Sequence, residues 1–365
     1  MSERVQRPQP AQPQPALPPG IASVLAVLPS SAVVLDGTDR VLRASSAARA
    51  FGLVSGDRLV PDELVRLADQ VRRDGEIRET EIEVARGRFG RDVACFSVRV
   101  APLGAWGLML VLAEDQTELR RVEAVRRDFV ANVSHELKTP VGALSLLAET
   151  VEGAADDPEA VVRFASRMQH ESNRLTNLVQ EIIVLSRLQS GDPIPEPEAV
   201  AIDAVVAEAI DRCRMKAEPK QITLVPGQSS GYSVLGDEDL LVTALRNLID
   251  NAVAYSPEET KVSVSARRSG DLIEISVSDQ GFGISQDNLE RIFERFYRVD
   301  PARSRATGGT GLGLAIVKHV TSNHGGEVTV WSREGSGSTF TLRLPLYKPE
   351  APSASDDTTL REATL

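Results

Sequence analysis

The sequence predicts a multidomain α+β protein, and three observations lead to this class. Its 365 residues are enough for two or three domains at roughly 150 residues each. Its composition, 42% hydrophobic and 25% charged, is typical of globular proteins that bury a core. The hydrophobic pattern also changes period along the chain, from a mixed α/β segment to long amphipathic helices and then to a second α/β segment.

Charge and residue counts exclude several classes of protein. The formal net charge of −11 argues against a nucleic-acid binder, which would present a basic face. Cys95 and Cys213 lie far apart, so neither a disulfide framework nor a cysteine metal site is expected. The longest apolar runs, 21–28 and 106–113, are well short of the roughly 20 residues that span a bilayer. The chain as given is therefore expected in the cytoplasm.

The first folded segment predicts a small mixed domain. Residues 1–20 alternate proline, glutamine and alanine, which predicts a disordered linker ahead of it. Residues 21–117 then begin with a hairpin around an Asp36-Gly37 turn. Short helices follow the hairpin, and three strand-like runs close the domain. These runs are 79–84, 93–101 and 106–113.

Residues 118–190 predict an antiparallel hairpin of two amphipathic helices. Apolar residues recur there at steps of three and four, and a break at 153–158 separates the helices. Pro140 is expected to kink the first helix. One hairpin leaves its apolar stripe exposed, and each large aliphatic side chain gains ~1.5–3 kcal/mol on burial. We therefore expect a homodimer in which two hairpins form a four-helix bundle.

A second α/β segment follows a proline-rich linker. Residues 198–346 predict an α/β sandwich with a mixed sheet, and residues 347–365 predict a disordered acidic tail. The expected helices are 202–215, 237–255 and 312–323. The expected strands are 260–266, 271–278, 327–332 and 338–344.

A histidine lies where the apolar stripe of the first long helix meets a proline. The run from Ser134 to Pro140 contains His135, Glu136 and Thr139. A histidine beside a glutamate on a helix is most often structural, so this motif gains weight only from its surroundings.

A second group of motifs is spread over the C-terminal segment. Asn247, Asn251 and Tyr255 are spaced i, i+4 and i+8, which places them on one face of a helix. The later pieces, in chain order, are Asp279-Gln-Gly281-Phe-Gly283, Phe293–Arg298, Gly308–Leu314 and Gly335–Phe340. Any single glycine-rich piece would be weak evidence, because glycines also make turns. Four pieces in this order, behind the asparagine helix, form a specific pattern.

These motifs resemble those of a known family. Residues 134–140 match the phospho-acceptor box of the sensor histidine kinases residue by residue. The second group resembles the nucleotide-binding domain shared by histidine kinases, gyrase, chaperone and mismatch-repair ATPases. The resemblance covers 118–345 and is closest to the phosphate-responsive sensor kinases of actinobacteria, through 126–135 in particular. Residues 21–117 resemble a PAS sensor domain, whose Asp-x-Thr ending is similar to residues 115–117.

The resemblance implies an ATP-dependent protein-histidine kinase of a two-component system, of the type that signals phosphate starvation. His135 would take the γ-phosphoryl group from Mg-ATP and pass it to an aspartate on the receiver domain of a response regulator. Glu136 would accept the Nδ1 proton as Nε2 attacks, and Thr139 would orient water for dephosphorylation of the regulator. Contact with a membrane is expected only through an anchor outside this chain.

The expected ATP site uses residue types that the nucleotide requires. Asp279 can accept the adenine amino hydrogen, and the amide oxygen of Asn251 suits a Mg²⁺ that bridges the phosphates. Glycines ahead of the helix at 312–323 present backbone N–H groups to the phosphates. Residues 284–310 would form a lid that orders on ATP. The residues expected to bind ATP are Asn247, Asn251, Tyr255, Asp279, Gly281, Gly283, Arg298, Gly309, Gly311, Leu312, Gly313 and Thr339.

Other nucleotide folds and other reactions compete with this interpretation. No Gly-x-x-x-x-Gly-Lys-Ser/Thr run occurs and no Gly-x-Gly-x-x-Gly follows a strand, which excludes two common folds. Asn247 stands where gyrases and chaperones carry a water-activating glutamate, so transfer to a protein is favoured over hydrolysis. A regulator-binding pseudokinase scaffold and a conformational ATPase stay as alternatives. Ala254 stands where many kinases of the family carry lysine, from which we expect weaker ATP binding.

Overall fold

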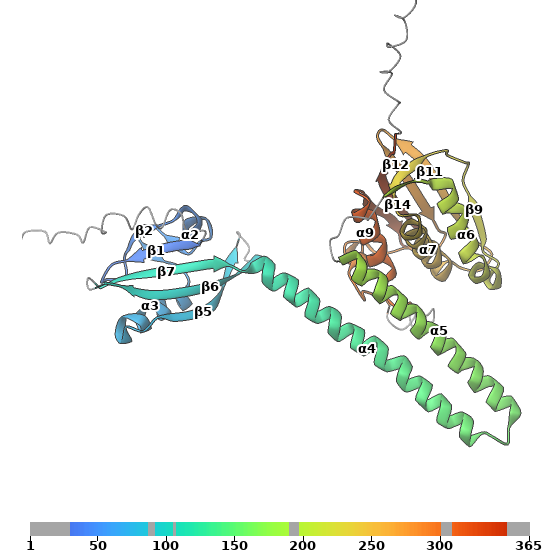
Figure 1. Cartoon of the computed structure of the whole chain (residues 1–365), viewed down its shortest axis with the longest axis horizontal. Coiled ribbons are helices and arrows are strands. Elements are labelled where there is room, and N and C mark those ends of the chain that lie inside the picture. Colours follow the sequence, from blue (N-terminus) through green and yellow to red (C-terminus); the bar gives the residue numbers. More distant parts are fainter. Residues whose placement is uncertain (1–29, 87–91, 105–106, 190–196, 301–308, 349–365) are drawn as a thin grey trace, which may run out of the picture. The chain divides into compact units, whose positions relative to one another are not determined.

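The computed structural model describes residues 30–86, 92–104, 107–189, 197–300 and 309–348. These residues belong to two compact units, and the division falls after Val130, inside one long helix (Figure 1). The expected linker 1–20, and the expected tail beyond residue 348, lie outside the described residues.

The first unit is built on a five-stranded antiparallel sheet with the strand order β2-β1-β7-β6-β5. Its strands are β1 (Ser31–Leu35), β2 (Val41–Ala44), β5 (Arg78–Arg86), β6 (Asp92–Leu103) and β7 (Leu108–Asp115). The antiparallel pairing of β1 with β2 confirms the expected hairpin around Asp36-Gly37. The three later strand-like runs are confirmed as β5, β6 and β7, with small shifts at their ends.

Two helices, α2 (Ser46–Ala50) and α3 (Asp62–Asp74), pack their apolar sides against this sheet. A ribbon of two short antiparallel strands, β3 (Val54–Ser55) and β4 (Arg58–Leu59), connects the helices. Leu64 of α3 and Phe96 of β6 are fully buried in the same cluster. Phe51 packs on this cluster, with its ring centroid 5.2 Å from that of Phe96.

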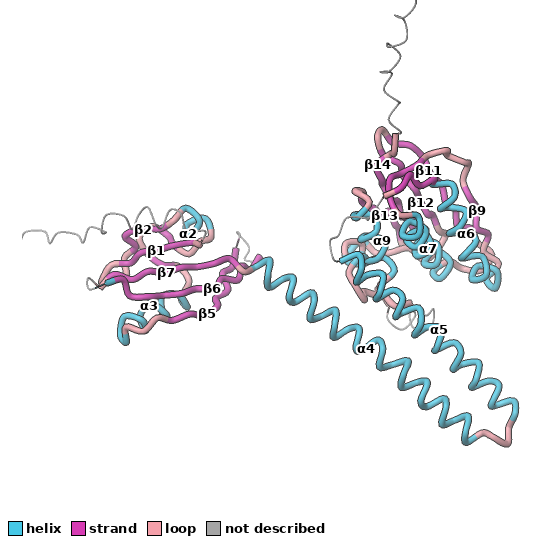
Figure 2. The backbone as a smooth tube through the Cα atoms, in the orientation of Figure 1, coloured by secondary structure: helices cyan, strands magenta, loops and turns pink. Residues whose placement is uncertain are grey.

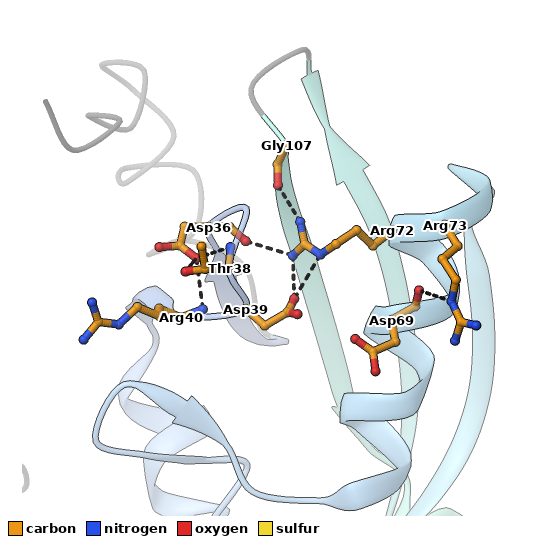
Figure 3. Close-up of polar contacts among 8 residues, drawn as sticks. All are labelled: Asp36, Thr38, Asp39, Arg40, Asp69, Arg72, Arg73 and Gly107. Carbon is orange, nitrogen blue, oxygen red and sulfur yellow. Dashed lines mark hydrogen bonds and ion pairs between the residues drawn. The ribbon is translucent and has the colours of Figure 1, made fainter. Parts of the chain in front are cut away.

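Arg72, in the last turn of α3, connects three parts of this unit (Figure 3). Its Nη2 donates to the carbonyl of Asp36 at 2.8 Å, and its Nη1 donates to the carbonyl of Gly107 at 3.0 Å. The guanidinium also pairs with the carboxylate of Asp39. Asp36 in turn accepts the backbone N–H of Thr38 at 2.7 Å, which closes the turn between β1 and β2. The helix end and two strand turns are therefore held at one point.

The first unit passes into α4 (Thr117–Gly153) through the Asp-x-Thr run. Thr117 Oγ1 accepts the backbone N–H of Cys95 at 3.0 Å, and the N–H of Gln116 donates to the Cys95 carbonyl at 2.8 Å. Arg120, one turn into α4, pairs with Glu81 of β5. The first turn of α4 is thus attached to two adjacent strands of the sheet.

In the second unit α4 and α5 (Pro158–Gln189) form the expected helical hairpin. The break between them falls at residues 154–157, within the predicted range. Helix α4 runs on through Pro140, where the sequence predicted a kink, as one continuous element.

The rest of the second unit is a two-layer α/β sandwich (Figure 2). Its sheet has the order β13-β14-β12-β11-β9; β9 is parallel to β11 and the other pairs are antiparallel, so the predicted mixed sheet is confirmed. The strands are β9 (Thr223–Pro226), β11 (Lys261–Ser269), β12 (Leu272–Ser278), β13 (Glu327–Arg333) and β14 (Gly337–Pro345). The helices of the second layer are α6 (Ile202–Ala217), α7 (Glu238–Tyr255) and α9 (Gly313–Asn323).

Three short strands of this unit were not predicted. They are β9 and the two members of a separate ribbon, β8 (Glu198–Ala201) and β10 (Ser233–Gly236). Each has only four residues, the shortest run over which a period-two alternation can be recognised. In the part of the chain that the structure describes, no helix has the length and apolar character needed to cross a membrane.

Candidate functional site

Helix α7 carries three of the predicted residues along one face. Asn247 is buried, with 7% of its surface exposed, Asn251 is half-buried, and Tyr255 in the last turn is 38% exposed. The helix begins after Asp237, whose carboxylate accepts the N–H of Leu240 at 3.0 Å. The face therefore runs from the core of the unit at Asn247 to its surface at Tyr255.

Asp279 follows the last residue of β12 and organises the turn after it. Its Oδ1 accepts the backbone N–H of Gly281 at 2.8 Å and that of Ser338, on β14, at 3.1 Å. Burial raises the pKa of this carboxyl, and the two hydrogen bonds lower it in part. Oδ2 accepts no hydrogen bond from the described residues, so it is available to a donor such as the adenine amino group.

Two glycines let three elements meet at this turn. A Cβ on Gly281 would lie 2.8 Å from the carbonyl oxygen of Tyr255, at the end of α7. Gly283 has φ +71°, and a Cβ there would lie 2.0 Å from the carbonyl oxygen of Arg333, at the end of β13. Any side chain would separate these elements, so the predicted need for glycine is explained by close backbone approach.

The glycine-rich run at 308–314 joins the same place from another side. Gly311 has φ +77°, and a Cβ there would lie 2.8 Å from the Cα of Phe296, whose N–H donates to the Gly311 carbonyl at 2.8 Å. A Cβ on Gly313, the first residue of α9, would lie 3.2 Å from the Asn247 amide oxygen. Leu312 is buried at the start of the helix, and Gly309 is half-buried beside it. The N-terminus of α9 therefore faces the asparagine helix.

The structure does not bring Thr339 to this place. Its hydroxyl bonds the Ser278 hydroxyl at 2.8 Å, on the face of the sheet opposite Phe340. Ser338 lies on the inner face instead, where its N–H reaches Asp279 and its hydroxyl bonds that of Ser332 at 2.9 Å. The role of Thr339 stays a prediction, and the structure places Ser338 beside Asp279 in its stead. Ser338 stands two residues before apolar Phe340, so both side chains lie on the same face of β14. This spacing could have identified Ser338 from the sequence.

His135 is displayed on α4, with 79% of its side chain exposed. Its Nδ1 lies 4.0 Å from Oε1 of Glu136, which is beyond hydrogen-bonding distance. Glu136 Oε2 pairs instead with Arg298 at 2.8 Å and lies 3.7 Å from Arg174 of α5, a residue that sequence reasoning missed. Thr139 Oγ1 donates to the His135 carbonyl at 3.3 Å, one turn back along the helix.

Arg298, expected beside the nucleotide, reaches the hairpin in this structure. The Nη2 that pairs with Glu136 also donates to the carbonyl of Thr310 at 3.0 Å. Thr310 Oγ1 in turn donates to Glu181 of α5, and burial raises the pKa of that carboxyl. Glu181 was not predicted, although it stands three residues after Leu178 in the apolar stripe of α5, where an acid is conspicuous. Of the expected lid, 301–308 lie outside the described residues.

The assembled groups fit an adenine nucleotide with its Mg²⁺. Asn247 Nδ2 is buried without a hydrogen-bond partner among the described residues, as is the hydroxyl of Ser256 next to Tyr255. Asp279 offers an acceptor, Asn251 offers the hard oxygen that Mg²⁺ prefers, and α9 offers a helix N-terminus to phosphates. These features define a nucleotide-binding domain joined to a helical hairpin that displays a histidine.

Comparison with known families identifies both the helical hairpin and the nucleotide-binding domain. The model described as His Kinase A (phospho-acceptor) domain matches residues 125–191. The model described as Histidine kinase-, DNA gyrase B-, and HSP90-like ATPase matches residues 236–348.

Relatives extend the match to most of the chain. The sensor-like histidine kinase SenX3 of Mycolicibacterium smegmatis is 47% identical over 92% of this chain and 87% of its own length. SenX3 of Mycobacterium tuberculosis H37Rv is 48% identical over 88% of this chain and 79% of its own length. The phosphate regulon sensor protein PhoR of Pseudomonas aeruginosa is 37% identical over 64% of this chain and 53% of its own length. The chain belongs to the histidine kinase family and is a sensor histidine kinase of a two-component system.

A solved structure shares the fold. Histidine kinase ThkA, in complex with the response regulator protein TrrA, aligns with a TM-score of 0.50 over 89% of this chain and 98% of that chain. The identity is 22%, so this likeness concerns the fold alone.

Proposed function

We propose that this kinase transfers the γ-phosphoryl group of Mg-ATP to Nε2 of His135 and passes it on to an aspartate of a response regulator receiver domain. One observation carries the proposal. A single unit of the structure combines an exposed histidine with a place where the asparagine face of α7, the Asp279 turn and the N-terminus of α9 meet.

Each residue has a task in the transfer. Asp279 holds the adenine through Oδ2, Asn247 and Asn251 hold the phosphate end, and the N–H groups around Gly311 and Gly313 bind phosphate oxygens. The nucleotide supplies the phosphoryl group, and its Mg²⁺ offsets the charge on it. The His135 lone pair forms the new P–N bond while the bond to the ADP oxygen breaks.

Glu136 receives the Nδ1 proton of His135 in this scheme. Because it lies 4.0 Å from that nitrogen and 2.8 Å from Arg298, it must exchange the guanidinium for the imidazole first. Release of Arg298 also frees the catalytic domain to approach His135 with its nucleotide. The ion pair therefore belongs to a conformation that precedes or follows the transfer.

Autophosphorylation tests the central claim. His135→Gln should abolish the acid-labile label that wild-type protein takes from ATP labelled in its γ-phosphate. His170→Gln, on an exposed position of α5, is the matched control and should keep the label. Label that persists in His135→Gln would move the acceptor elsewhere and overturn the assignment.

We further infer that the same hairpin dephosphorylates the regulator and that phosphate limitation is the signal. The hydroxyl of Thr139 stands one helical turn from His135 and can orient a water for this step. The likeness to PhoR supports the signal. Thr139→Ala should leave autophosphorylation intact and slow the decay of phosphorylated regulator; an unchanged decay would remove this role.

In cells, the level of phosphorylated regulator should rise when phosphate is withdrawn.

A further inference from the structure

Lys220 reaches the end of the asparagine helix from a different part of the chain. It stands at the end of η2 (Glu218–Lys220), the short turn that follows α6. Its Nζ donates to the carbonyls of Val253 at 2.8 Å, Ala254 at 2.9 Å and Ser256 at 3.4 Å. The last carbonyls of a helix have no intrahelical partner and carry partial negative charge. One ammonium group, with three donors, therefore caps the C-terminus of α7.

The capped turn is the part of α7 that meets the Asp279 turn. Tyr255 lies between Ala254 and Ser256, and its carbonyl is the group that abuts Gly281. Lys220 also accepts the N–H of Glu259 at 3.0 Å through its own carbonyl, so it holds the chain on both sides of the helix end.

We propose that Lys220 is a positioning residue for nucleotide binding in this kinase. Its ammonium holds the last turn of α7 in place, so that Tyr255 and the Gly281 backbone stay in contact beside Asp279. It acts through the helix end and does not touch the nucleotide. This inference rests on the proposed function, since it concerns the same site.

Kinetics separates this role from a general contribution to stability. Lys220→Met keeps the length of the side chain and removes the three donors, so the last turn of α7 is ordered in only a fraction of the molecules. The apparent KM for ATP should rise about tenfold, because affinity falls with the fraction of competent protein. The kcat for labelling of His135 should stay within about twofold, because saturating ATP restores the ordered state.

Lys216→Met is the matched control. Lys216 lies on α6 and pairs with Asp250 of α7 at 2.7 Å, but in the middle of the helix and not at its end. Its KM should stay within about twofold of wild type, although it also loses a contact with α7. Lys220→Arg, which keeps the charge without the compact three-donor geometry, should raise KM to an intermediate value.

Binding of a non-hydrolysable fluorescent ATP analogue to the full chain measures the same effect without the transfer step. If Lys220→Met lowers the melting temperature while KM and analogue affinity stay at the wild-type values, Lys220 is only structural and the inference is overturned. Should Lys220→Met not fold, unchanged affinity in Lys220→Arg overturns it equally. A wild-type chain that binds the analogue but never labels His135 would contradict the proposed function and leave this inference standing.

Discussion

Ser338 and Thr339 are neighbours in the sequence. Because side chains alternate along β14, theirs point to opposite faces of the sheet. Ser338 is 6% exposed, and its hydroxyl belongs to a chain that passes through Ser332 Oγ to the N–H of Ile284. Thr339 bonds Ser278 on the other face. The two hydroxyls therefore have different tasks, although the residues are chemically alike.

This difference predicts a contrast between two conservative variants. Ser338→Ala removes a buried hydroxyl from the network around Asp279 at a cost of about 1 kcal/mol, and ATP affinity should fall about fivefold. Thr339→Val keeps the shape and loses only the bond to Ser278, so affinity should stay within about twofold. Titration of both proteins with ATP by calorimetry decides the matter. Equal losses in the two variants would favour the predicted role of Thr339 in ATP binding.

His324 is a buried residue whose protonation should govern the stability of the same unit. Its Nε2 accepts the N–H of Asp237, the N-cap of α7, at 3.1 Å, and its Nδ1 lies 2.8 Å from the Val320 carbonyl. A Cβ on Gly236 would lie 2.1 Å from the ring, so the imidazole packs directly against the Gly236 backbone. Burial lowers the pKa of His324 below its usual 6.5, because the charged ring would lose its water, and contacts with Val320 and Asp237 offset this in part.

The sign of the pH effect follows from that lowered pKa. Below pH 6.5 the unfolded chain binds a proton at His324 that the folded chain still excludes, so stability is complete above pH 6.5 and is lost as the pH falls toward the folded pKa. His324→Gln keeps an acceptor that does not titrate. Its loss of stability between pH 7 and 5.5 should be smaller than that of wild type by about 1 kcal/mol. Urea unfolding followed by Trp331 fluorescence, in a Trp106→Phe background, measures this; parallel pH profiles would contradict it.

Among elements, the Asp279 turn and the β13–β14 hairpin approach each other closely at two glycines, Gly283 on the turn and Gly337 on the hairpin. Gly283 and Gly335 both have positive φ, +71° and +75°. Of these two, only Gly283 faces another backbone, 2.0 Å from where its Cβ would be, and Gly335 has open space. Substituting each of these two glycines therefore distinguishes the free-energy cost of a left-handed backbone from the cost of lost packing.

The two alanine variants should differ sharply. Gly335→Ala should destabilise the unit by about 1–2 kcal/mol and leave ATP affinity unchanged, since only its backbone conformation is strained. Gly283→Ala must push the hairpin off the turn, so ATP binding should be lost along with a larger share of stability. Thermal denaturation and ATP titration of both proteins check this. Equal behaviour would show that the hairpin is not tightly packed there.

The same elements show how far a sequence can be interpreted. Helices α7 and α9 and the four longer strands of the second sheet were predicted to within a few residues, because caps, apolar periods and glycine breaks mark them locally. The spacing of Asn247, Asn251 and Tyr255 likewise needs only one helix. The positions of Arg298 and Glu181 depend on contacts between segments far apart in the sequence, which no local pattern encodes. Lys220 was missed for that reason, since its acceptors lie more than thirty residues away.

At the scale of the whole molecule, the helical hairpin leaves large aliphatic side chains in contact with water. The exposed residues on α4 and α5 within the second unit include Val141 at 50%, Leu146 at 64% and Val162 at 66%. Each would contribute ~1.5–3 kcal/mol if buried against a second copy of the chain. Two-fold pairing of hairpins into the predicted four-helix bundle would bury part of this apolar surface.

Dimerisation should therefore depend on these side chains and on protein concentration. We expect light scattering to report twice the chain mass at micromolar concentration. Leu146→Glu combined with Val162→Glu should shift the equilibrium to monomer, because association would bury unpaired charges. Val60→Glu, at a 51% exposed position of the first unit, is the control and should stay dimeric. A wild-type chain that remains monomeric at every concentration would mean that α4 and α5 bury their stripe in another way, and that phosphotransfer to His135 occurs within a single chain.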